Sequence, residues 1–87
     1  MEKNHELLVN LEKLHTTARG VSRIAKNLSL DGVDVVDWCK AKIKSPRATI
    51  TRHGKNWYVY VDDCVLTIHA THYTIITAHR FKQQKTT

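Results

Sequence analysis

The C-terminal half of the chain alternates apolar and polar residues at period two, which is the pattern of half-buried β-strands. Three successive runs between Trp57 and Arg80 show this alternation, and a shorter run precedes them from Ala48 to His53. Turn sequences separate the runs at residues 53–56, 62–63 and 70–72. The pattern therefore predicts a four-stranded antiparallel meander over about residues 48–81.

Apolar residues in the N-terminal half recur at helical spacing instead. The spacing predicts one helix over about residues 2–15, a second capped by Thr16 or Thr17, and a third that has Asp31 as its N-cap and stops before Pro46. Their apolar faces consist of Leu7, Leu8, Leu11 and Leu14; Val21, Ile24, Ala25 and Leu28; and Val35, Val36, Cys39 and Ile43.

These elements predict a single α+β domain over residues 1–87, with helices over about residues 2–44 packed on one face of the sheet. A polar tail from Lys82 to Thr87 is expected to fray. The covered face is predicted to bury Trp57, Val59, Leu66, Ile68 and Ile76. The uncovered face is predicted to present Thr49, Thr51, His53, Tyr58, Tyr60, Thr67, His69, Thr77 and His79.

Charge is distributed unevenly over the 87 residues, whose net charge is +6. Residues 1–39 carry five Lys or Arg and six Asp or Glu, whereas residues 40–87 carry nine Lys or Arg and two Asp. A basic sheet half favours a polyanionic partner, either nucleic acid or an acidic protein surface. Because the chain has no long apolar run and no leader pattern, we expect a cytoplasmic protein that does not bind membranes.

The candidate nucleic-acid contacts are the cations around the junction of helix and sheet, which we expect to form one patch. Tyr60 adds an aromatic ring that stacks on a base, and Arg23 adds a helical cation. The full set is Lys42, Lys44, Arg47, Arg52, Lys55, Tyr60 and Arg23.

The uncovered face also carries the groups needed for metal-independent RNA cleavage. His79 is the candidate proton-transfer group and His69 its partner, because histidine titrates near neutrality. Arg80 or Arg52 is the candidate for stabilising phosphate charge, and Tyr58 or Tyr60 for positioning the nucleotide. The alternative is an ordinary solvated sheet face, and the residue pattern leaves both open.

The sequence gives little support for a metal site or for a reactive thiol. The six histidines match no zinc spacing, and Asp62 and Asp63 are the only carboxylates of the basic half. We therefore expect no metal and no cofactor. Cys39 and Cys64 fall on predicted core positions, where a free cysteine acts as a small hydrophobe.

Two segments resemble a small bacterial family of unknown function that also occurs on mobile elements: LHTTARGVSRIAKNLSLDGVDVVDWCKAKI and GKNWYVYVDDCVLTIHATHYTIITAHR. More distantly, helices followed by four strands with a basic last strand resemble the barnase/RelE-like toxin ribonucleases. That second resemblance implies Arg23, His79 and Arg80 as site residues, with His15 as a fourth. The catalytic carboxylate that barnase uses has no clear counterpart in the chain.

Two functions follow as hypotheses. One is an endoribonuclease toxin of a toxin–antitoxin system, or an RNA-binding relative, with RNA favoured over DNA and an antitoxin as partner. The other is a non-enzymatic phage or mobile-element inhibitor that binds a nucleoprotein complex of a bacterial defence system. The small size is also compatible with a homodimer.

Overall fold

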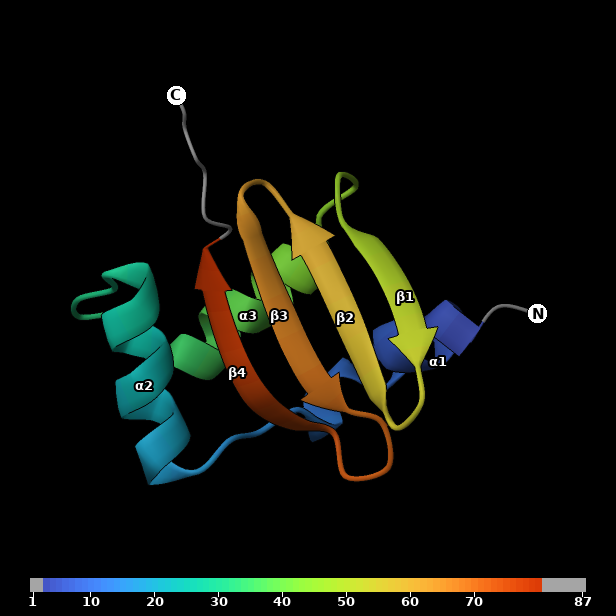
Figure 1. Ribbon diagram of the computed structural model, residues 1–87, viewed down its shortest axis with the longest axis horizontal. Helices are drawn as coiled ribbons and strands as arrows, with labels where there is room; N and C mark the ends of the chain where they lie inside the picture. The colour runs from blue at the N-terminus through green and yellow to red at the C-terminus, as the bar shows by residue number, and fades with distance from the viewer. Residues whose placement is uncertain (1–2, 81–87) are drawn as a thin grey trace.

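The computed structural model describes residues 3–80 and confirms the α+β class (Figure 1). The helical elements come first: α1 (Lys3–Val9), the 3-10 turn η1 (Leu11–Lys13), α2 (Ala18–Leu28) and α3 (Val35–Ile43). The strands β1 (Thr49–His53), β2 (Asn56–Val61), β3 (Cys64–His69) and β4 (Thr74–Arg80) follow. The predicted helix start at Glu2, the end of the meander at residue 81 and the tail Lys82–Thr87 lie outside the described residues.

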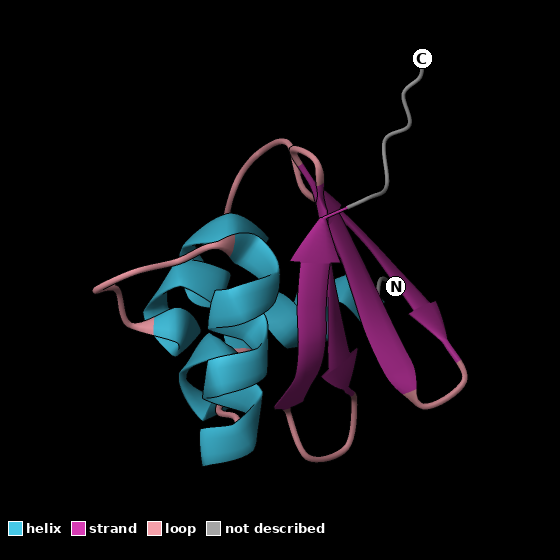
Figure 2. Ribbon diagram, turned by 60° about the vertical axis from the view of Figure 1, so that its left-hand side comes forward, coloured by secondary structure: helices cyan, strands magenta, loops and turns pink. Residues whose placement is uncertain are grey.

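The four strands form one antiparallel sheet in the order β1-β2-β3-β4. All the helices lie on one side of it, as Figure 2 shows. In Figure 1, α1 and α3 lie behind the sheet while α2 stands beside β4. The core between the two layers includes the predicted Trp57, Val59, Leu66 and Ile68, each at most 1% exposed. The helices therefore leave the opposite sheet face uncovered.

The first predicted helix is interrupted at Asn10. The backbone of Asn10 leaves the helical region, with φ −116° and ψ 26°. Its side-chain Nδ2 donates to the Glu6 carbonyl at 2.8 Å and to the Tyr73 hydroxyl at 3.2 Å. An asparagine side chain that bonds nearby backbone competes with the helix ladder. The prediction of one helix through residue 15 is wrong for this reason.

The helix caps differ in part from the prediction. Thr17 is the N-cap of α2, because its Oγ1 accepts a hydrogen bond from the Gly20 amide at 3.0 Å. Asp34, and not Asp31, caps α3, and its Oδ1 accepts from the Asp37 amide at 3.1 Å. Gly32 lies between the two aspartates with φ +74°, a conformation outside the helical region, so the helix starts only after it.

The outer edge of β4 is covered along its length. At its start, the His15 amide donates to the Tyr73 carbonyl at 3.2 Å, and the Ile75 amide donates to the His15 carbonyl at 2.8 Å. Thr16 Oγ1 donates to the Ile75 carbonyl at 2.9 Å. Farther along, Asn27 Nδ2 of α2 donates to the Ala78 carbonyl at 3.2 Å. These bonds hold α2 alongside β4.

A β-bulge in β4 corrects one predicted core residue. Thr77 pairs with Thr67, but the next pair along is Ile75 with Ile68, so Ile76 has no opposite residue. Ile75 is 1% exposed and Ile76 is 41% exposed. An extra residue in one strand shifts the alternation by one position. The sequence pattern assigned Ile76 to the core, whereas Ile75 occupies that place.

The variants Ile75→Ala and Ile76→Ala test whether β4 contains the bulge. Emptying a buried isoleucine site costs about 2–5 kcal/mol of unfolding free energy. An exposed substitution usually changes it by less than about 0.5 kcal/mol. We therefore expect urea denaturation to show a large loss for Ile75→Ala and almost none for Ile76→Ala. The reverse order would mean that β4 pairs without the bulge.

Candidate nucleic-acid interface

The sheet face turned away from the helices, called the open face below, is built from three rows of side chains across the strands. The strand register sets the rows. The first row is Thr49, Tyr60, Val65 and His79; the second is Thr51, Tyr58, Thr67 and Thr77; the third is His53, Asn56, His69 and Thr74. None of these twelve residues is acidic. An approaching anion therefore meets no like charge on this surface.

Tyr58 occupies a central position on the open face, in an inner strand and in the middle row. Its ring lies 5.9 Å from the His53 ring, centroid to centroid, at a tilted angle of 58°. Asn56 Nδ2 donates to its hydroxyl at 3.3 Å. Tyr60, two residues on, lies on the same face and is 38% exposed. Both tyrosines are thus on the predicted face.

The two candidate catalytic histidines share the open face but lie at opposite ends of it. His79 is opposite Val65, and His69 is opposite Thr74. Val65 and His69 are four residues apart on β3, which separates them by roughly 13 Å. His69 Nδ1 instead accepts from the backbone amides of Thr71 and His72, at 3.3 and 3.4 Å. The structure therefore does not bring His69 to His79 as a proton-transfer partner.

Arg80 points to the other side of β4 from His79, as successive strand residues do. Its Nη1 lies 3.3 Å from Asp63 Oδ1, and its Nη2 donates to the Leu28 carbonyl at 3.2 Å. It thereby joins the end of β4 to the turn after β2 and to the end of α2. Arg80 and His79 do not face a common site.

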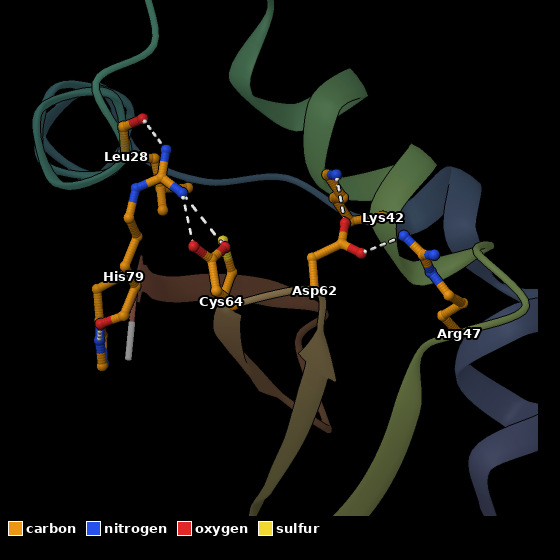
Figure 3. Close-up of polar contacts among 8 residues, drawn as sticks. Leu28, Lys42, Arg47, Asp62, Cys64 and His79 are labelled. Atoms are coloured by element: carbon orange, nitrogen blue, oxygen red, sulfur yellow. Dashed lines mark hydrogen bonds and ion pairs between the residues drawn. The ribbon is translucent and has the colours of Figure 1, made fainter. Parts of the chain in front are cut away.

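The expected single cationic patch is divided between the two ends of β1. At one end, Lys42 Nζ and Arg47 Nη2 contact the two carboxylate oxygens of Asp62, at 2.8 and 3.0 Å (Figure 3). The hydrogen bonds from Lys42 and then from Arg47 lower the pKa of Asp62 below its usual range. Lys44, exposed, is the C-cap of α3 nearby.

At the other end of β1 lie Arg52 and Lys55. Arg52 Nε donates to the Gly54 carbonyl at 3.1 Å, and its guanidinium lies 5.5 Å from the centre of the Trp57 ring, on the helix side. Lys55, exposed, lies in the turn between β1 and β2. Arg52 lies five positions after Arg47, at most roughly 17 Å along the chain. Local charge is accordingly lower than the sequence count suggests.

The comparisons with known proteins give one match. The model of a family described as "Protein of unknown function (DUF3781)" covers residues 8–79. The chain belongs to this family. No curated protein and no solved structure matches it. None of the comparisons links this DUF3781 chain to the barnase/RelE-like ribonucleases.

Thiols and metal-binding side chains add little to the candidate site within residues 3–80 of the DUF3781 chain. Burial raises the pKa of the Cys39 thiol to about 12, and burial also raises that of Cys64. Residues 3–80 contain no group of three or more His, Cys, Asp or Glu side chains arranged to hold a metal ion. Within the same range no helix is long and apolar enough to span a membrane.

Arg23 is exposed on α2, between two further cations of the same helix. Arg19 and Lys26 lie four residues before and three residues after Arg23, so the three share one side of the helix. This spacing is visible in the sequence alone. His15, the fourth resemblance-derived residue, lies instead at the start of β4, where its Nε2 is 3.1 Å from Thr74 Oγ1.

The Asp62 contacts predict a pH-dependent difference in stability. A carboxyl whose folded-state pKa is lowered stabilises the fold above its unfolded pKa of about 3.9, and this contribution disappears as pH falls through the folded-state value. Asp62→Asn should therefore have a lower thermal midpoint than wild type at pH 7. The two midpoints should converge as pH falls below about 3.9. Asp31→Asn is the matched control, and an equal effect from it would contradict a specific role for Asp62.

Proposed function

We propose that the open face binds single-stranded RNA. The observation that carries the proposal is the uncovered, carboxylate-free face with Tyr58 at its centre, Tyr60 beside it and three histidines around them. Proteins that bind single strands combine aromatic side chains, on which bases stack, with cations that follow the backbone. The sheet supplies the first of these components.

RNA is favoured over DNA by the hydroxyl groups of the open face. Thr67 and Thr77, both half-buried, stand in the same row as Tyr58. A threonine hydroxyl both donates and accepts hydrogen bonds, and so does the ribose 2′-hydroxyl that distinguishes RNA from DNA. Bases stacked on the tyrosines would bring their riboses over this row.

Tyr58→Leu tests the stacking role. Loss of one aromatic–base stack costs about 1–3 kcal/mol, which is roughly a 5- to 150-fold loss of affinity. We expect a loss in this range for a fluorescein-labelled unstructured 12-nucleotide RNA, measured by anisotropy. The DNA strand of the same sequence should bind the wild type less tightly.

Trp38→Leu is the control, because it removes an aromatic ring from the helix side of the molecule, where Lys42 Nζ lies 5.3 Å from the ring centre. Its affinity for RNA should equal that of wild type once circular dichroism has shown both to be folded. If wild type bound no RNA, or if Tyr58→Leu bound as well as wild type, the open face would not be an RNA-binding surface. A protein or nucleoprotein target, as in the inhibitor hypothesis, would then take precedence.

A ribonuclease activity at the same face is a second candidate, and the hydrogen bond of His79 favours it. His79 Nδ1 lies 3.1 Å from the Arg80 carbonyl oxygen. A carbonyl only accepts, so this contact fits the Nδ1–H tautomer, in which Nε2 is the nitrogen without a proton. An unprotonated imidazole nitrogen on the RNA-facing surface is the form that a general base requires.

His79→Ala distinguishes cleavage from binding alone. Loss of a general base typically costs about 10²- to 10⁴-fold in rate. If the wild type cleaves RNA, this variant should do so slower by that factor while its thermal midpoint stays unchanged, and the wild-type activity should persist in EDTA. His69→Ala is the matched comparison and should retain most activity because of its distance from His79. Equal losses would mean that the two histidines act together.

A further inference from the structure

Three cations form a stripe along one side of α2. Arg19, Arg23 and Lys26 follow one another at helical spacing, and all three are exposed. The helix contains no Asp or Glu. Within residues 3–80, none of the three side chains has a hydrogen-bond or ion-pair partner. These residues are called the α2 stripe below.

The α2 stripe borders the open face at β4. Ile24 and Leu28 turn toward the core, and Asn27 reaches the Ala78 carbonyl at the outer edge of β4. Arg23 lies one turn before Asn27, on the same side of the helix and away from the apolar side. Figure 1 shows α2 standing beside β4, while α1 and α3 lie behind the sheet. The stripe therefore flanks the β4 side of the surface that carries Tyr58 and His79.

Three other cations near the sheet, Lys42, Arg47 and Arg80, are paired with carboxylates. Asp62 holds Lys42 and Arg47, and Asp63 holds Arg80. A cation already paired with a carboxylate gains less from a phosphate, because the first pair must be broken or shared. The α2 stripe can bind a phosphate without first breaking such a pair. It is thus better placed for anion binding than the junction cations Lys42 and Arg47.

We infer that the α2 stripe holds the sugar–phosphate backbone of a single-stranded RNA whose bases lie on the open face. This inference rests on the function proposed above and adds where the backbone runs. The stripe is about 10 Å long from Arg19 to Lys26. It runs alongside β4, so the bound strand follows β4 and turns its bases inward across the sheet.

The test is a triple variant, Arg19→Gln, Arg23→Gln and Lys26→Gln, in the full chain. Glutamine keeps a high helix propensity, so α2 should remain folded. Each phosphate contact on a single strand contributes about −0.7 to the slope of log K against log salt concentration. We expect the slope for the labelled 12-nucleotide RNA to become shallower by about 2 and the affinity at 0.1 M salt to fall about ten-fold or more.

A second triple variant, Lys3→Gln, Lys13→Gln and Lys40→Gln, removes the same net charge from α1, η1 and α3, outside the candidate contacts and the α2 stripe. Its salt slope should stay close to that of wild type. If both triples changed the slope equally, or if only the second did, the α2 stripe would not hold the backbone. Tyr58→Leu separates the two proposals: weaker binding by this variant together with an unaffected α2 triple would overturn the inference and leave the open face as the RNA-binding surface.

Discussion

The two main-chain hydrogen bonds that join His15 to Tyr73 and Ile75 determine where the second helix can lie. They fix the chain against the outer edge of β4 just before α2 begins. The helix then continues alongside that edge, where Asn27 and Arg80 make further bonds between the helix and the strand. A helix held at the edge cannot also cross the open face. The uncovered sheet surface and its flanking cations both depend on this attachment.

The meander and the number of helices could be predicted because each rests on a period within a short stretch of sequence. Period two gave the four strands, and the buried Trp57, Val59, Leu66 and Ile68 lie where it placed them. The Ile75–Ile76 exchange could not be predicted, because a bulge breaks the period without a distinctive residue to mark it. The break at Asn10 depends partly on Tyr73, which is 63 residues away. No local pattern contains that contact.

For the candidate site, the sequence predicted which residues share a face but not which of them meet. Tyr58, Tyr60, His69 and His79 are all on the open face, yet strand register places the two histidines far apart. The charge count was similarly incomplete, because Asp62 lies 20 residues from Lys42 in sequence and contacts it in space. Net charge along a sequence thus overstates the charge that a folded surface offers to a partner.

The burial of both cysteines has a practical consequence for studying this surface. Cys39 and Cys64 are the only thiols in the chain; they are at most 2% exposed, and burial raises the pKa of each. Reagents that attack thiolates therefore find little to react with in the folded protein. A single cysteine introduced at an exposed position such as Ile76 would be the preferred labelling site. Spectroscopic probes can be attached on β4, two strands from Tyr58, without first removing the natural cysteines from the core.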